Sequence, residues 1–95
     1  MSHNQVTLSE AIDAFLRNPR IRAGVDEARV KQLWAQLMGP AIARYTTDIQ
    51  LHRERLTLTI SSAPLKNELF YSREKIKELF NRELGHEAIK QVQVQ

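Results

Sequence analysis

Apolar residues recur at helical spacing in the first part of the chain. Thr7 and Glu10 form the capping-box pattern that begins a helix. Asn18-Pro19 ends it, because proline disfavours the α conformation in the residue before it. Between these signals the apolar positions share one helical stripe: Leu8, Ala11, Ile12, Phe15 and Leu16. The pattern predicts a first helix, followed by a short connection over residues 20–24.

A second apolar stripe follows this connection. It consists of Val30, Leu33, Trp34 and Leu37. Asp26 is well placed to cap the start of this helix. Gly39-Pro40 breaks it and opens a short third helix that ends near Tyr45.

From Thr46 the apolar period changes to two. The alternating residues are Ile49, Leu51, Leu56, Leu58 and Ile60. They predict an antiparallel hairpin with one apolar face. Its turn, near Arg53-Glu54, lacks the usual Gly or Asn, so we expect Glu54 or Arg55 to carry a strained or longer loop.

Helical spacing returns after the hairpin. Ser62 is a favourable cap, Pro64 a favourable first-turn residue and Gly85 a strong stop. These signals predict one long helix over about residues 64–84. Its mostly apolar stripe is Leu65, Leu69, Ser72, Ile76, Leu79, Phe80 and Glu83. Val92 and Val94 then indicate a last strand, with Ile89 before it or at a bulge.

The elements have the order α-α-(α)-β-β-α-β. This order predicts a two-layer α+β domain whose last strand pairs beside one hairpin strand in a three-stranded sheet. We expect the helices to cover the apolar face of the sheet and the opposite face to be wet. A chain of 95 residues is the size of one domain. We therefore predict a single domain over residues 1–95, with residues 1–6 flexible.

Composition changes this picture little. The net charge of +3 is mild and spread along the chain. It permits nucleic-acid binding and equally describes an ordinary solvated surface. The absence of cysteine excludes disulfides and thiolate zinc sites. No apolar run reaches the roughly 18–20 residues of a membrane span, and the first residues do not resemble a signal peptide. We expect a cytoplasmic protein without membrane contact.

The sequence does not indicate catalytic or cofactor chemistry. His3, His52 and His86 lie in separate polar segments that we expect to be exposed, without the spacing of metal ligands. Ser61-Ser62 lacks the context of a hydrolase nucleophile. The three glycines form neither a phosphate loop nor the GxxG turn of a KH domain. We expect no cofactor, no metal and no enzymatic activity.

The long predicted helix carries the main candidate for nucleic-acid contact. One stripe, about a quarter-turn from the apolar one, holds three cations and one aromatic residue: Lys66, Phe70, Arg73 and Lys77. Such a stripe can contact phosphates and stack a base. Alternatively, Phe70 is a boundary core residue and the cations pair with Glu74 and Glu78.

Two smaller groups are also candidates. Arg53 and Arg55 lie at the tip of the predicted hairpin, and a protruding basic loop can insert toward a nucleic-acid backbone. An ordinary solvated turn accounts for them as well. Trp34 lies on an apolar stripe, which favours the core, but a partly exposed Trp34 would anchor a protein partner. With Tyr45, it is our candidate for partner contact.

Several short motifs, taken in order, resemble the bacterial DciA family. They are Leu33-Trp34, Met38-Gly39-Pro40, Tyr45-Thr46, the run from Leu56 to Leu69, Leu84-Gly85 and the closing strand from Ile89 to Val94. The most telling run is Ser61-Ser62-Ala63-Pro64-Leu65-Lys66-Asn67-Glu68-Leu69. The resemblance covers about residues 8–95.

The resemblance implies a KH-like α+β domain without the GxxG loop. It implies a non-ATPase accessory role in loading the DnaB-type replicative helicase, with contacts to the helicase and weak contacts to single-stranded or forked DNA. Two departures stand out. Family members commonly place Gly in the hairpin turn, where this chain has Glu54-Arg55, and longer members carry a flexible tail, whereas this sequence is nearly all domain.

Two alternative functions remain open at this point. One is a protein-interaction adaptor without nucleic-acid contact. The other is a KH-like RNA-binding module, which is less favoured because no exposed pair of aromatic residues is evident on the predicted strands.

Overall fold

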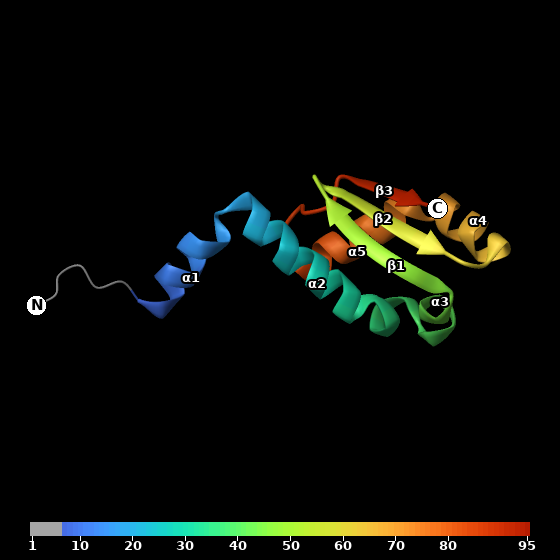
Figure 1. Ribbon diagram of the computed structural model, residues 1–95, viewed down its shortest axis with the longest axis horizontal. Coiled ribbons are helices and arrows are strands. Elements are labelled where there is room, and N and C mark those ends of the chain that lie inside the picture. The colour runs from blue at the N-terminus through green and yellow to red at the C-terminus, as the bar shows by residue number, and fades with distance from the viewer. Residues whose placement is uncertain (1–6) are drawn as a thin grey trace, which may run out of the picture.

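The computed structural model describes residues 7–95 (Figure 1). Its elements are α1 (Leu8–Leu16), α2 (Pro19–Met38), α3 (Pro40–Arg44), β1 (Thr46–His52), β2 (Arg55–Ile60), α4 (Ala63–Tyr71), α5 (Arg73–Leu84) and β3 (Gln91–Val94). The predicted α+β class and three-stranded sheet are confirmed. The flexible start predicted for residues 1–6 lies outside the described residues.

The sheet has the order β1-β2-β3. The antiparallel β1–β2 hairpin places Leu51 opposite Leu56 and Ile49 opposite Leu58. The parallel β2–β3 pair places Leu56 opposite Val92. The predicted pairing of the last strand beside a hairpin strand is therefore confirmed. A parallel neighbour needs a crossover connection, and α4 with α5 provides it.

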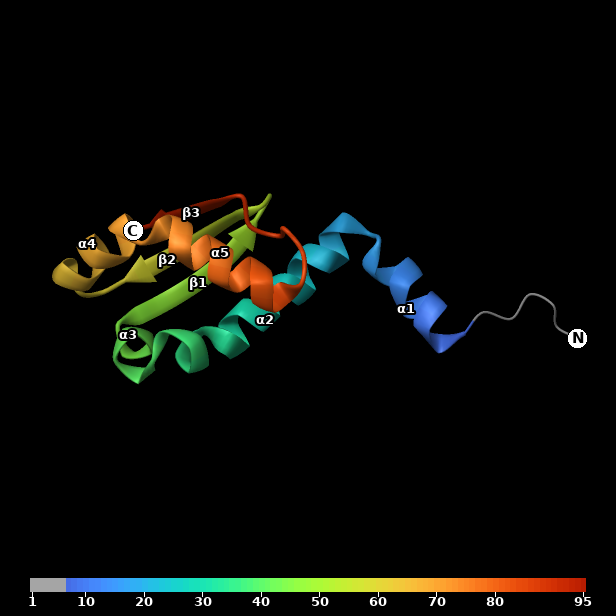
Figure 2. The same ribbon diagram turned by 180° about the vertical axis from the view of Figure 1, so that it is seen from behind.

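One face of the sheet forms the core. Figure 2 shows α2 and α5 lying across this face. They contribute buried Trp34 and Phe80, whose rings stack with centroids 5.3 Å apart. The Trp34 indole N–H donates to Thr46 Oγ1 at 2.9 Å, so its polar atom is satisfied. The opposite face is polar as predicted, with exposed Gln50, His52, Gln91 and Gln93.

The second helix begins earlier than predicted. The structure extends α2 back to Pro19, so the expected connection over residues 20–24 is helical. Asn18 caps it, because its side-chain oxygen accepts from the Arg20 N–H at 3.0 Å, and Pro19 provides the first turn. Asp26 is therefore not a cap. It lies inside the helix and is buried.

The long helix predicted over residues 64–84 is two helices. Ser72 leaves the helical conformation with φ −103° and ψ 12° and separates α4 from α5. A straight 21-residue helix is about 31 Å long, and a bend lets both halves stay on the small sheet. Leu69 of α4 and Ile76 of α5 are both buried in the core.

The hairpin turn is tight and strained. Arg53 and Glu54 have φ of 49° and 66°, the left-handed conformation of a two-residue hairpin turn that normally contains Asn or Gly. The strain predicted at Glu54 is confirmed and includes Arg53, whereas Arg55 is the first residue of β2. The Glu54 carbonyl accepts from the Lys90 N–H at 2.8 Å, which ties the turn to the segment before β3.

α1 differs from the other helices because it does not cover the sheet. Its predicted capping box is present, and the hydrogen bonds from Thr7 hold the pKa of the Glu10 carboxyl below its usual value. None of its residues is buried. Figure 1 shows α1 projecting from the rest of the molecule. We call α1 the arm and residues 19–95 the body.

Candidate nucleic-acid and partner interfaces

The junction between α4 and α5 gathers two aromatic rings and a guanidinium group. The Arg73 guanidinium lies 3.8 Å from the centroid of the Phe70 ring, a cation–π contact. The Tyr71 ring meets Phe70 edge-on, with centroids 5.4 Å apart. Phe70 is 42% exposed and Tyr71 79% exposed. We call Phe70, Tyr71 and Arg73 the aromatic–arginine cluster.

The helix break at Ser72 holds this cluster in place. Arg73 Nε donates to the Phe70 carbonyl oxygen at 2.8 Å, a bond that fixes the guanidinium beside the ring. The cluster therefore presents π faces and a positive charge on the molecular surface, at the start of a helix. Single-stranded nucleic acids are bound by this combination, because bases stack on rings and guanidinium planes while phosphates meet the charge.

The other two cations of the predicted stripe have different surroundings. Lys66 is exposed, and within residues 7–95 it takes part in none of the side-chain hydrogen bonds or ion pairs. Lys77 pairs with Glu74 at 3.0 Å, and the hydrogen bond to Glu74 raises the pKa of Lys77. The alternative interpretation, in which a cation of the stripe pairs with Glu74, is therefore correct for Lys77. Among the described residues, Lys66 and Arg73 remain the cations of the stripe without an ion pair.

Arg53 and Arg55 lie away from this cluster. Figure 1 shows the hairpin tip at the opposite end of the sheet from α4. Arg53 lines a cleft of about 750 Å³ between the tip, the start of α2 and the segment before β3. Arg55 is exposed on β2. The six nucleic-acid candidates therefore fall on two separate surfaces.

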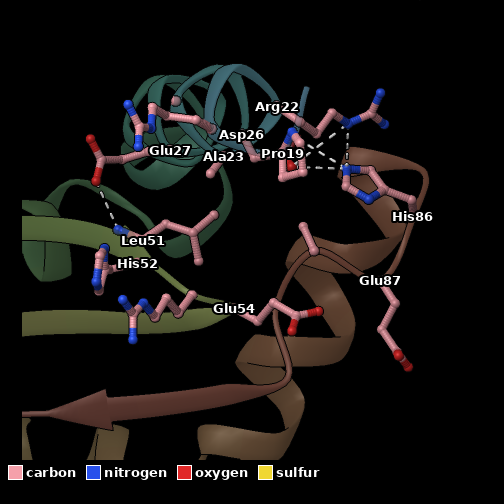
Figure 3. Close-up of a pocket in the computed structure, with 14 residues that line it drawn as sticks. Pro19, Arg22, Ala23, Asp26, Glu27, Leu51, His52, Glu54, His86 and Glu87 are labelled. Carbon is pink, nitrogen blue, oxygen red and sulfur yellow. Dashed lines mark hydrogen bonds and ion pairs between the residues drawn. The ribbon is translucent and has the colours of Figure 1, made fainter. Parts of the chain in front are cut away.

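The wall of this cleft contains a hydrogen-bonded group of three residues (Figure 3). His86 Nε2 lies 3.0 Å from a carboxylate oxygen of buried Asp26 and 3.3 Å from Arg22 Nε. A ring nitrogen donates only when it carries a proton and accepts only when it does not. Nε2 can therefore donate to Asp26 in one protonation state or accept from the Arg22 Nε–H in the other, but it cannot do both at once. His86 is partly buried and contacts Asp26 and Arg22, so the prediction that it is exposed is wrong.

The cleft is not a uniformly positive surface. Arg20, Arg22 and Arg53 line it together with Asp26, Glu27, Glu54 and Glu87. Glu27 accepts from the Leu51 N–H at 2.8 Å, and Glu54 pairs with Lys90 at 3.5 Å. These contacts join α2 to the sheet edge and the hairpin to the following segment. These contacts stabilise the fold, and they are not evidence that the cleft binds a ligand.

The two predicted partner residues have opposite environments. Trp34 is only 2% exposed, so its assignment to the core is confirmed and its side chain offers no surface to a partner. Tyr45 is 42% exposed. It borders a groove of about 240 Å³ between α3 and the start of α4, lined mainly by apolar residues: Ala41, Ile42, Tyr45, Ser62, Pro64, Leu65 and Glu68. We call this the Tyr45 groove.

Two features were not predicted from the sequence. The sequence analysis did not identify Tyr71 as a candidate. Its position next to Phe70 could have indicated it, because two adjacent helical residues cannot bury both rings on the same side of the helix. The contact between Asp26 and His86 joins residues 60 positions apart. No local pattern indicates it.

Residues 7–95 contain neither a candidate metal site nor a candidate membrane-spanning helix. No three His, Asp or Glu side chains in this range are grouped so that they could hold a metal ion. None of the described helices has the length and apolarity needed to cross a membrane.

Comparison with known proteins gives one result. Neither curated proteins nor solved structures match the chain significantly. The model of the family described as "Dna[CI] antecedent, DciA" matches residues 7–94. This match spans the arm, all three strands, the aromatic–arginine cluster and the Tyr45 groove. The protein therefore belongs to the DciA family.

Proposed function

We propose that this protein is a non-enzymatic accessory factor that assists loading of the DnaB-type replicative helicase and binds single-stranded DNA weakly. Family membership supports the role in helicase loading. The observation that carries the DNA half is the aromatic–arginine cluster, in which an arginine is held against an exposed ring.

The cluster suits weak binding without sequence readout. Tyr71 has a largely open ring face for one base, and the Arg73 guanidinium covers Phe70 and can itself stack a second. Lys66 adds a charge one helical turn before Phe70. Stacking and phosphate contact of this kind tolerate any sequence, because every base has a π face.

The DNA half is tested by fluorescence anisotropy with a labelled single-stranded oligonucleotide at several salt concentrations. Tyr71→Ala is expected to weaken binding by about fivefold or more, since loss of one stacked base costs about 1–3 kcal/mol. Arg73→Gln is expected to weaken binding and to reduce the slope of log K against log salt by about 1.

Arg29→Gln is the matched control for charge. Arg29 is exposed on α2, so this change removes the same charge elsewhere on the body. If Arg29→Gln and Arg73→Gln weaken binding equally, the cluster is not the DNA site. If the wild-type protein does not bind even at low salt, the protein is an adaptor without nucleic-acid contact. Repeating the titration with RNA of the same sequence tests the RNA-binding alternative.

The Tyr45 groove is our proposed contact for the protein partner. It combines an exposed aromatic residue with an apolar lining, which is the composition of a pocket that receives an apolar side chain. It does not overlap the aromatic–arginine cluster in residues. Helicase and DNA can therefore be bound by separate surfaces.

This assignment predicts that Tyr45→Ala weakens helicase recovery in a pull-down by about tenfold, which corresponds to the loss of one interface anchor. The experiment is done with nuclease, so that DNA cannot bridge the two proteins. Tyr71→Ala serves as the control, because it removes an exposed aromatic ring from the other surface. Equal recovery with Tyr45→Ala and the wild type would exclude the groove.

A further inference from the structure

The outer edge of β3 has unpaired backbone groups. Gln95 bonds to the inner side of the sheet, because its N–H donates to the Leu58 carbonyl oxygen and its carbonyl oxygen accepts from the Ile60 N–H, both at 2.8 Å. The backbone groups of consecutive strand residues point alternately to the two sides of the strand. Those of Val92 and Val94 therefore point away from β2. Because β3 is last in the order β1-β2-β3, no strand within residues 7–95 pairs with them.

The opposite edge of the sheet is covered. On β1, the Leu51 N–H donates to the Glu27 side chain at 2.8 Å, so α2 satisfies a group at that edge. Figures 1 and 2 show no helix beyond the outer side of β3. Natural proteins protect open edges with charged residues, proline or bulges. Residues 91–95 contain only glutamine and valine, and β3 pairs with β2 in a regular register. This edge is therefore open to another strand.

We propose that β3 of a second copy of this chain pairs with this edge in the antiparallel direction, so that the two three-stranded sheets become one. The sequence of residues 91–95, Gln-Val-Gln-Val-Gln, reads the same in both directions. With a two-fold axis at Gln93, Val92 of each copy lies opposite Val94 of the other, and each glutamine lies opposite a glutamine. A two-fold interface requires a surface that is complementary to itself, and this strand provides one.

The backbone groups fit the same register. Opposed residues of an antiparallel pair alternately exchange two hydrogen bonds and none. The outward groups of Val92 and Val94 allow each opposed valine pair to exchange both bonds. Gln93 then occupies the non-hydrogen-bonded position on the axis, where opposed side chains lie closest. If the axis lay at Val92 instead, charged Lys90 would face Val94, so the palindrome selects the register centred on Gln93.

The two faces of the sheet also continue across the axis. Val92 is buried, and Val94 is partly buried against the core, so their pairing extends the apolar layer. The glutamines of β3 are exposed on the wet face, where opposed amides can hydrogen-bond to each other. No charge lies between the copies, because Lys90 precedes the paired residues and pairs with Glu54. A second copy therefore matches the edge in backbone, side-chain type and charge.

The pairing is small. A single strand per copy provides far fewer residues than the roughly 20–30 per side of a standard interface. We therefore expect a weak, concentration-dependent dimer.

The first test is sedimentation velocity of the full chain at low salt from about 10 µM to 1 mM, the range in which such small interfaces associate. We expect a reversible monomer–dimer equilibrium. Gln93→Lys and Gln93→Glu each place like charges opposite each other on the axis, and each should weaken association about fivefold. An equal mixture of the two variants pairs opposite charges and should associate at least as strongly as the wild type.

Gln50→Lys is the matched control. Gln50 is exposed on β1, and the register places it on the same face of the sheet as Gln93 but at the covered edge. This variant should associate like the wild type. Because both side chains are exposed, all of these variants should melt like the wild type.

The second test uses the absence of cysteine from the sequence. Opposed residues at a non-hydrogen-bonded position have Cα atoms about 4.5 Å apart, which a disulfide can span. Gln93→Cys should therefore form a covalent dimer under mild oxidation, whereas Gln50→Cys should stay monomeric.

Three results would overturn the proposal. One is a wild type that stays monomeric up to about 1 mM, the upper end of the range for small interfaces. Another is a mixture of Gln93→Lys and Gln93→Glu that associates no better than either variant alone, because the two strands would then not meet at Gln93. The third is Gln93→Lys that loses helicase recovery in the pull-down but keeps wild-type self-association, which would assign the edge to the helicase.

Discussion

At the scale of single residues, the most consequential contact is the one between Asp26 and His86. The Asp26 side chain is 8% exposed, so its carboxylate has little access to water. Its partners are His86 and, at 3.9 Å, Arg22. A buried charge that loses its partner is costly, because the remaining group is desolvated without compensation. The contact also joins α2 to the segment that leads into β3.

We predict that His86→Ala lowers the free energy of unfolding by about 1–3 kcal/mol, a value below that of a fully buried pair because His86 is partly exposed. Chemical denaturation at pH 7 measures this change. Lys31→Ala, which removes the exposed i,i+4 partner of Glu27, is the comparison and should cost at most about 0.5 kcal/mol. Equal costs for the two variants would show that Asp26 does not depend on His86.

At the scale of elements, the sequence predicted those whose signals are local. The capping box of α1, the break at Gly39-Pro40, the alternating strands and the stop at Gly85 each depend on a few neighbouring residues, and each was correct. Asp26 was misassigned because its polar side chain resembles a cap, whereas its true partner is distant in sequence. The bend at Ser72 was missed because the apolar stripe continues across it, and only the size of the sheet requires it.

The hairpin turn provides a test at this scale. Glu54→Gly should raise the free energy of unfolding by about 1 kcal/mol, because a left-handed conformation costs a non-glycine residue about 1–2 kcal/mol and part of this gain is offset by the flexibility of glycine. The exposed ion pair between Glu54 and Lys90 contributes little to stability, so its loss in the variant costs little. Denaturation of the variant beside the wild type measures the change.

Gly85→Ala is the opposite control for the hairpin. Gly85 has φ of 80°, so alanine there should destabilise the protein by about 1 kcal/mol. If Glu54→Gly is neutral while Gly85→Ala is destabilising, the turn of the wild-type protein is not strained in solution.

At the scale of the whole molecule, the protein is elongated. Its Cα radius of gyration is 16.2 Å, compared with about 12 Å for a compact chain of this length. The sequence could not predict this shape, because the stripe of the arm has the same spacing as the stripes of α2 and α5, which are buried. Periodicity identifies a face that will be covered but not what covers it. The same limit applies to the candidate sites. The sequence indicated Phe70 and Arg73 and favoured the core for Trp34, but only the structure separates Phe70 and Arg73 from Arg53.

The parallel pairing of β3 with β2 has a consequence for the rate of folding. The β1–β2 hairpin closes over a two-residue turn, whereas Val92 reaches Leu56 only after two complete helices have intervened. Contacts between residues distant in sequence pay their loop-closure entropy before they gain stability, and they form late. Docking of β3 is therefore expected to follow the transition state, so that weakened contacts of β3 accelerate unfolding and leave the folding rate nearly unchanged.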